Sequence, residues 1–259
     1  MPTKKTKDIA ATQTIASNAT EPNPYAHLSV CVMAHTSERG KAIASLVPSL
    51  PAGVEICIVF NEQGDTDDFE LTKDERLPKG GAVRFAEMTW TDFSFAHVRN
   101  CSLKLATRPW ILWIDADELL ATGQFNSLAN LVNVPRGVGA LMCTVAGLQP
   151  AMFDGDDAKR FASAQPRIIR NDAAFEFRGH CHEQVMWSIQ EAGYRVEESP
   201  IVVVHTGYII DRVGMIEKMN RNVSLLIRQC NEWDGDDLFF HKLLHRDLQN
   251  LISLKESTK

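Results

Sequence analysis

Four apolar runs in the first half of the chain predict buried strands. They cover Leu28–Ala34, Val54–Phe60, Ala82–Met88 and Trp110–Ile114. Runs of this length that are rich in Val, Ile and Cys are typical of strands buried on both faces. Between them, apolar residues at helical spacing predict helices over 37–50, which Pro48 should end early, and over 95–107. Strands that alternate with helices indicate an open α/β sheet, mostly parallel.

The second half of the chain has a different pattern. Four further runs predict strands, the last two of them flanking a turn at 171–172: Gly139–Ala146, Ile201–His205, Pro166–Arg170 and Ala174–Phe177. From Asp211 onward, apolar residues at helical spacing predict two helices separated by 231–237, the second over 239–254. Such a pair is an αα-hairpin packed on the domain, or the start of an array of helical repeats.

This pattern predicts a leader, one α/β domain and a helical extension. Residues 1–25 are polar and end in the breaker Pro22–Pro24, which predicts a disordered leader. The α/β domain then covers 26–210 and the helical extension 211–259. A length of 259 residues suits one large domain with an appended helical piece.

Composition narrows the compartment and the partners. The chain is 44% hydrophobic and 23% charged, and its net charge of −6 gives no general attraction to nucleic acid or to an anionic membrane. Its six cysteines are irregularly spaced without a CxxC pair, which favours reduced thiols in a cytoplasmic protein. The sequence contains no run of about 18 apolar residues, so it predicts no transmembrane helix. The predicted leader lacks the apolar centre of a signal peptide.

The strand Trp110–Ile114 runs directly into three carboxylates, those of Asp115, Asp117 and Glu118. Crowded carboxylates are costly unless they are compensated, and a hard divalent cation shared with substrate phosphates is their natural partner. In an extended backbone, Asp115 and Asp117 would point to the same face and reach one metal–phosphate group. The alternative is that the strand ends in a solvated acidic turn.

Polar loops follow three of the predicted strands, at 34–37, 61–68 and 115–118. Ligands of open α/β sheets bind outside the carboxyl ends of the strands. The three loops therefore predict a nucleotide or phosphate site at one edge of the sheet.

Five segments, in their order along the chain, resemble the family 2 glycosyltransferases, which have the GT-A fold. They are LSVCVMAHT, EICIVFNEQGDTDD, FSFAHVRNCSLKLATRPWILWIDADE, RGHCHEQV and HTGY, and the resemblance extends over roughly residues 28–228. The third segment is the most specific, because it joins Arg-Asn at the head of a helix to an apolar strand and an Asp-x-Asp motif. Arg221–Leu226 also matches the subgroup in which the catalytic domain precedes helical, TPR-like repeats.

The resemblance implies a metal-dependent, hexosyltransferase-type enzyme that takes its sugar from a nucleotide-diphosphate sugar. It implies that Asp115 lies near the ribose or the metal, and that Asp117 ligates Mn²⁺ or Mg²⁺ on the diphosphate. His205 would complete the metal shell, because imidazole suits Mn²⁺. The alternative for His205 is a core residue at the end of a buried strand.

The same resemblance places Thr36, Asn61, Arg99 and Asn100 around the nucleotide. Asn61 stands where the family usually has an acidic residue that meets the base. Its amide both donates and accepts hydrogen bonds, so a pyrimidine edge remains readable. The alternative for Arg99 and Asn100 is a place in the solvated first turn of a helix.

Glu183 is the candidate general base, and His182 a candidate contact to the acceptor or the phosphates. In an inverting transfer, a carboxylate deprotonates the acceptor hydroxyl as it attacks the anomeric carbon. The alternative for Glu183 is a structural ion pair with Arg178 or Arg170. A zinc site built from the neighbouring His and Cys side chains lacks a clear fourth ligand.

The acceptor cannot be read from this fold, so a saccharide, a protein, a metabolite and a modified nucleic-acid base all stay open. A different class of function is a catalytically inactive glycosyltransferase-like domain that serves as a binding module through its C-terminal helices. A phosphohydrolase is disfavoured, because its Asp-x-Asp motif would follow the first strand, whereas here the motif follows the fourth.

Overall fold

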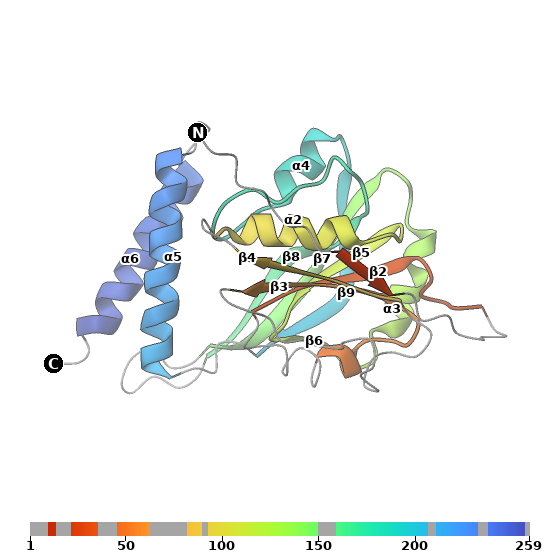
Figure 1. Ribbon diagram of the computed structural model, residues 1–259, viewed down its shortest axis with the longest axis horizontal. Coiled ribbons are helices and arrows are strands. Elements are labelled where there is room, and N and C mark those ends of the chain that lie inside the picture. The colour runs from red at the N-terminus through yellow and green to blue at the C-terminus, as the bar shows by residue number, and fades with distance from the viewer. Residues whose placement is uncertain are drawn as a thin grey trace.

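The computed structural model describes residues 10–13, 22–35, 46–62, 82–89, 93–149, 159–206, 211–232 and 238–256. Their strands form one mixed sheet in the order β1-β4-β3-β2-β5-β8-β7-β9-β6. Helix α2 covers one face of the sheet, and the long helices α5 and α6 stand beside it (Figure 1). The predicted α/β class, with a mixed sheet and a C-terminal helical pair, is confirmed.

The first half of the chain supplies the parallel part of the sheet, β4-β3-β2-β5, and helix α2. Its elements are β1 (Ala10–Gln13), β2 (Leu28–His35), η3 (Val47–Ser49), β3 (Glu55–Glu62), β4 (Ala82–Thr89), α2 (Phe95–Leu105) and β5 (Trp110–Asp115). Strands β2, β3, β4 and β5 all run in the same direction, so their carboxyl ends lie at one edge. In this register Asp115 pairs with Met33, and Asn61 pairs with His35.

The second half adds the antiparallel part of the sheet and the remaining helices. Its elements are β6 (Glu118–Leu120), α3 (Phe125–Ala129), η5 (Asn130–Asn133), β7 (Val138–Gln149), β8 (Lys159–Arg170), α4 (Met186–Glu191), β9 (Arg195–His205), α5 (Arg212–Glu232) and α6 (Leu238–Glu256). Strand β8 joins the two parts, because it pairs antiparallel with both β5 and β7. Within the described residues of this half, parallel pairing is confined to β7 with β9.

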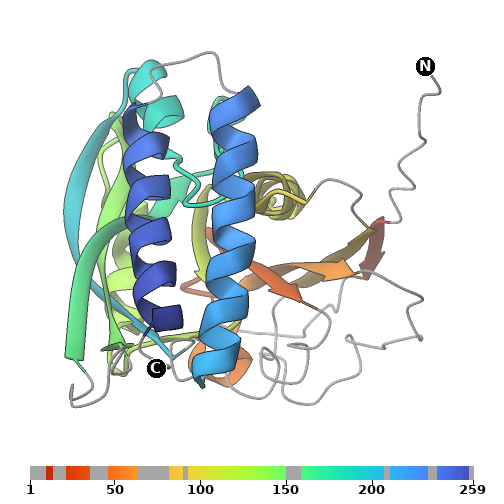
Figure 2. The same ribbon diagram turned by 90° about the vertical axis from the view of Figure 1, so that its left-hand side faces the viewer.

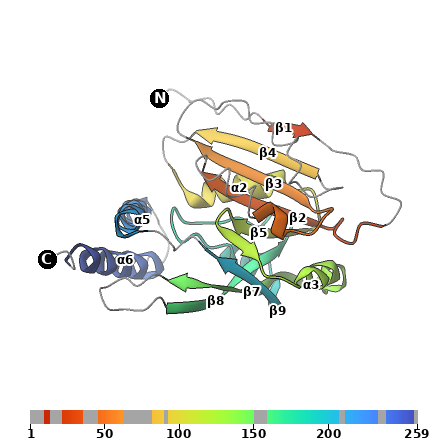
Figure 3. The same cartoon turned by 90° about the horizontal axis from the view of Figure 1, so that it is seen from below.

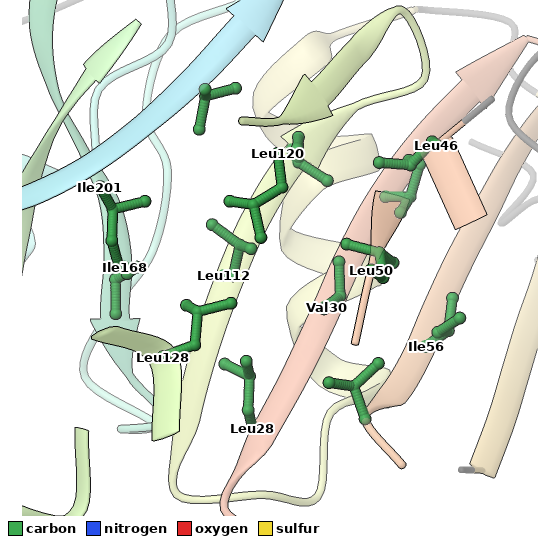
Figure 4. Close-up of a cluster of buried hydrophobic side chains, with 14 of the residues drawn as sticks. Leu28, Val30, Leu46, Leu50, Ile56, Leu112, Leu120, Leu128, Ile168 and Ile201 are labelled. Atoms are coloured by element: carbon green, nitrogen blue, oxygen red, sulfur yellow. The ribbon is translucent and has the colours of Figure 1, made fainter. Parts of the chain in front are cut away.

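Alternate residues of the central strands face two separate cores, as the two-residue period of a strand requires. One core packs β2, β3 and β5 against η3 and α3, and Figure 4 shows part of it: Leu28, Val30, Leu46, Leu50, Ile56, Leu112, Leu120, Leu128, Ile168 and Ile201. The other core packs against α2 and includes Cys31, Ile111, Trp113, Ala96 and Leu103. Trp113 therefore points to the α2 side, and Asp115, two residues further on, belongs to the same face.

The helices α5 and α6 lie side by side (Figures 2 and 3). They share a small core of their own: Met215, Met219, Val223, Leu251 and Leu254. A second cluster, of Cys181, Leu225, Leu226 and Phe240, joins them to the loop after β8. The helical extension is thus packed on the α/β domain through this loop.

Several sequence-based boundaries differ from the structure. Four residues of the predicted disordered leader form β1, which pairs antiparallel with β4 at the edge of the sheet. The predicted strand at 174–177 does not form, because Glu176 N–H and Phe177 N–H donate to the side chains of Ser188 and Asn100 rather than to a neighbouring strand. Most of the predicted helix over 37–50 lies outside the described residues.

Candidate active site

The acidic segment after β5 is a turn rather than an extended strand. Ala116 and Asp117 form the turn, and Glu118 begins β6, which pairs with β9. The expectation that Asp115 and Asp117 point to the same face of an extended backbone is therefore wrong. The buried Oε2 of Glu118 accepts the N–H of Asp115 at 2.8 Å and so closes the turn.

Arg99 joins Asp115 to Glu183. Its Nη2 lies 2.9 Å from Asp115 Oδ1 and 2.8 Å from Glu183 Oε1, and its Nε donates to the same Glu183 oxygen at 2.8 Å. Arg99 occupies the stripe of α2 that faces the sheet, between Ala96 and Leu103, and is only 3% exposed. The alternative that Arg99 sits in a solvated first turn is therefore wrong, and so is the alternative pairing of Glu183 with Arg178 or Arg170.

Arg167 of β8 is a second buried guanidinium at this site. Its Nη2 lies 2.6 Å from Glu118 Oε1, and its Nη1 lies 4.0 Å from Asp115 Oδ2. The guanidinium groups of Arg99 and Arg167 lie 4.3 and 3.9 Å from the centre of the Trp113 ring. The electron-rich face of an indole attracts cations, so Trp113 acts as a platform for both.

The two arginines set the ionisation of the acidic residues. Burial opposes ionisation of Asp115, but the charges of Arg99 and Arg167 outweigh it and lower its pKa to about 2. Burial and the charge of Asp115 raise the pKa of Glu118 to about 7, although Arg167 opposes that shift. The pKa of Arg99 is raised by Asp115 and Glu183 against its burial, so it stays protonated.

Asp117 and His205 lie together, as their predicted shared role in metal binding requires. Glu118 pairs with His205 in the β6–β9 register, which brings the preceding Asp117 to 3.9 Å, measured from Oδ1 to His205 Nε2. Thr206 donates from its N–H and its hydroxyl to the Asp117 carbonyl at 2.9 and 2.6 Å. Burial lowers the pKa of His205 against the pull of Asp117, so its ring is neutral near pH 7.

Asn100 has a structural contact at this site. Its amide donates to the Phe177 carbonyl at 2.9 Å and accepts the Phe177 N–H at 2.7 Å. These two bonds tie α2 to the segment that leads into Glu183. Thr36 lies outside the described residues, and Asn61 is placed only by its backbone, in β3 at the same sheet edge as Asp115.

His182 precedes Glu183 in a loop that α5 and α6 contact. Its Nε2 lies 2.9 Å from Asp247 Oδ2 of α6 and 3.2 Å from Arg246 Nη2. Its φ of 54° makes it the one non-glycine residue with a left-handed backbone in the described part of the chain. The structure therefore connects His182 to the helical extension.

A cavity of about 420 Å³ lies between α2, the residues before Glu183 and the end of α5. Its lining includes His97, Asn100, Lys104, His180 and Glu232, and none of the acidic residues around Arg99. The cavity is therefore separate from the acidic cluster.

Sequence reasoning missed Arg167, Trp113 and the burial of Glu118. One signal was available for both arginines, because each replaces an apolar residue on a stripe that faces the core. Arg99 lies between Ala96 and Leu103, and Arg167 shares its strand face with Ile169. A guanidinium in such a position requires buried carboxylate partners.

No family model matches the chain. A TPR repeat-containing protein of Synechococcus elongatus is 28% identical over 163 residues, which are 58% of this chain and 38% of that protein. The chain thus spans well under half the length of that relative.

Among the described residues, no helix is long and apolar enough to cross a membrane.

Two solved structures are similar in outline. Residues 1–349 of TarS from S. aureus, also solved with UDP-GlcNAc, are 16% identical, with a TM-score of 0.47 over 87% of this chain and 72% of that one. The mannosyltransferase PcManGT of Pyrobaculum calidifontis, solved with GDP-Man and Mn²⁺, is 15% identical, with a TM-score of 0.47 over 92% of this chain and 76% of that one.

Proposed function

We propose that this chain is a nucleotide-sugar-dependent glycosyltransferase of the family 2 type. In this proposal Asp117 binds a divalent cation, and Glu183 is the general base. The observation that carries the proposal is the charge of the cluster. Three carboxylates, of Asp115, Glu118 and Glu183, pair with the guanidinium groups of Arg99 and Arg167. A fourth carboxylate, that of Asp117, lies beside His205. A divalent cation would balance the excess of negative charge.

The titration of Glu118 supports the same interpretation. In the cluster as it stands, Glu118 has a pKa of about 7, which is what burial beside uncompensated negative charge produces. A cation bound nearby favours ionised carboxylates and would reverse this shift. The cluster is thus poised for a partner that carries positive charge.

Asp117 and His205 have the right chemistry to hold that cation. A carboxylate oxygen and a neutral imidazole nitrogen suit Mn²⁺, and their side chains are 27% and 12% exposed. No group of three or more His, Cys, Asp and Glu side chains in the described residues could hold an ion alone. The remaining ligands would be water and the donor's phosphate oxygens, and the bound cation would stabilise the charge that develops on the departing diphosphate.

Glu183 is suited to accept a proton from the acceptor hydroxyl. Its Oε1 is held by Arg99, which fixes the direction of the carboxylate. Its Oε2 has no partner among the described residues and stays available for the proton. A single carboxylate base is what an inverting transfer needs, so we infer inversion at the anomeric carbon.

Thermal stability in the presence of nucleotide sugars tests this function. A panel of UDP-, GDP-, CDP- and dTDP-sugars, each with and without Mn²⁺, should contain a donor that stabilises the protein only with the metal. At about 100 times its dissociation constant, that donor should add ~2.7 kcal/mol to the free energy of unfolding. Asp117→Asn should abolish the metal-dependent shift, whereas Glu176→Gln, a change at an exposed carboxylate, should preserve it.

Turnover separates an active enzyme from a binding module. Glu183→Gln should keep the donor-induced shift and lose metal-dependent hydrolysis or transfer of the sugar. A wild-type protein that binds a donor but never turns it over would favour the inactive binding module instead. The same shift in Asp117→Asn as in the wild type would contradict the proposed metal site. The acceptor and a cytoplasmic location stay predictions from sequence.

A further inference from the structure

The loop that carries Glu183 is closed on itself and has unusual backbone angles. Arg178 and Gln184 exchange both of their backbone hydrogen bonds, at 3.0 and 2.9 Å. Between them, Gly179 has a φ of 106° and His182 a φ of 54°. Glycine adopts such angles freely, but histidine does so at a cost, so other contacts must hold His182 in this conformation.

Helix α5 holds the first part of this loop. The side chain of Gln229 is 3% exposed, and its Oε1 accepts the N–H of His180 at 2.6 Å. The carbonyl of His180 in turn accepts the N–H of Phe95, the first residue of α2. The loop is therefore fixed between α2 and α5 just before Glu183.

Helix α6 holds the second part of the loop. Phe240 packs so closely on Gly179 that an added Cβ would lie 2.9 Å from its ring. About two turns further along α6 than Phe240, Asp247 reaches His182, with its Oδ2 2.9 Å from His182 Nε2. The Asp247 side chain is only 7% exposed, whereas that of His182 is 31% exposed. A buried carboxylate thus anchors a partly exposed ring.

The chemistry of the pair fixes which atom carries the proton. An ionised carboxylate only accepts hydrogen bonds, so His182 Nε2 must donate to Asp247. Hydrogen bonds from His182 and Arg246 lower the pKa of Asp247 and outweigh its burial, which keeps it ionised near neutral pH. With Nε2 protonated, Arg246 cannot donate to the same nitrogen and binds Asp247 Oδ1 instead, at 2.8 Å.

We propose that Asp247 of α6 is a positioning residue for the reaction: by holding the His182 ring, it keeps the strained loop in place and aims Glu183. This inference rests on the proposed role of Glu183. Because Glu183 follows His182 directly, a change in the His182 backbone would move the Glu183 carboxylate away from Arg99. The helical extension is thereby part of the active site rather than a separate appendage.

Three variants test the proposal. Asp247→Ala removes the acceptor for His182, whereas Asp247→Asn retains an amide oxygen that can accept the same hydrogen bond. Glu232→Gln is the matched control, since Glu232 binds His180 of the same loop at 2.8 Å but is 56% exposed, and an exposed pair contributes little. Hydrogen exchange of the peptide that covers 178–184 and turnover of the donor found in the nucleotide-sugar panel are measured for each.

Asp247→Ala should accelerate exchange of the Arg178, His180 and Gln184 amides by about tenfold or more, because their hydrogen bonds open with the loop. Its kcat should fall by about 10- to 100-fold, with the donor KM within about twofold of wild type, because only the base is displaced. Asp247→Asn should recover most of both losses, and Glu232→Gln should match the wild type. If Asp247→Ala does not fold, His182→Asn replaces it, since Asn tolerates a left-handed backbone and cannot reach Asp247.

The outcomes separate this inference from the proposed function. Wild-type exchange and kcat in Asp247→Ala would overturn the inference, as would an Asp247→Asn variant that is as defective as Asp247→Ala. An increased donor KM with unchanged kcat would also overturn it, by showing a role in binding. If the wild type turns over no donor, the proposed function fails. Faster hydrogen exchange of residues 178–184 in Asp247→Ala, but not in Glu232→Gln, would then still show that α6 holds this loop in place.

Discussion

Replacing Arg167 by methionine would leave the Glu118 carboxylate buried without the guanidinium group that it pairs with. The two groups are 2.6 Å apart, and their side chains are 3% and 0% exposed, so no water can substitute for the guanidinium. Removing one partner of a buried ion pair typically costs about 3–5 kcal/mol. Methionine retains much of the contact with Trp113, so we expect Arg167→Met to lose about 3 kcal/mol of stability above neutral pH.

The loss should depend on pH, because protonation of Glu118 relieves it. In the wild type the folded pKa of Glu118 is about 7, against the ordinary value of 4.5 for a glutamate side chain. A carboxyl group whose pKa is higher in the folded than in the unfolded state stabilises the folded state at low pH. This stabilisation is lost as pH rises through the folded pKa. For Glu118 this amounts to about 3 kcal/mol between pH 4 and pH 8. Without Arg167 the folded pKa rises further, so stability keeps falling above pH 7.

Urea denaturation with a chelator present, at about pH 5.5 and about pH 8.5, measures this effect. The destabilisation by Arg167→Met should be larger at the higher pH by about 1.4 kcal/mol for each unit of additional pKa shift. Adding Glu118→Gln to Arg167→Met should recover stability at the higher pH. Arg170→Met is the matched control: Arg170 lies on the same strand over Trp110, but it donates to backbone carbonyls and has no carboxylate partner among the described residues. Equal losses at both pH values for Arg167→Met would refute the reasoning.

Two further predictions concern stability away from the proposed cation. Glu55, at the opposite end of its strand from the site, accepts hydrogen bonds from Ser29, Arg84 and Thr107, and these lower its pKa and outweigh its burial. Glu55→Gln should therefore cost about 2–3 kcal/mol at pH 7, and less as pH falls through the folded pKa, in urea melts; an unchanged midpoint at pH 7 would contradict this. Gly179→Ala should cost at least ~2 kcal/mol by thermal unfolding, because of its φ of 106° and the Phe240 ring; Phe240→Leu should relieve only the steric part, and full recovery would show that the backbone angle is not strained.

The parallel half of the fold could be predicted from the sequence, because its strands are buried on both faces. Continuous apolar runs identified β2, β3, β4 and β5 to within one or two residues. The same rule failed for β9, whose first half, Arg195–Pro200, is polar and mostly exposed and therefore has no apolar pattern. It also failed for 174–177. Phe175 and Phe177 are spaced two residues apart, as in a strand, but they lie in a loop and pack into the core beside α2.

The acidic half of the candidate site could also be found from the sequence, since Asp115, Asp117 and Glu118 are contiguous and follow a recognisable strand. The proximity of His205 to Asp117 depends on the β6–β9 register. This register could not be predicted from sequence, because β6 has only three residues. Only the resemblance to a known family brought His205 to attention. Local patterns identify which groups carry charge, and tertiary pairing decides which of them meet.

The arginines show what a purely local interpretation leaves out. Three carboxylates at the end of a buried strand suggest a metal site on their own, but Arg99 and Arg167 already neutralise part of their charge. Asp115 and Glu183 are held by Arg99, so neither is free to serve as a primary cation ligand without giving up a buried ion pair. Asp117 instead lies beside the neutral imidazole of His205, with 3.9 Å between its Oδ1 and His205 Nε2. Under the proposed function, the arginines therefore leave the cation to Asp117 and His205, and proton transfer to Glu183.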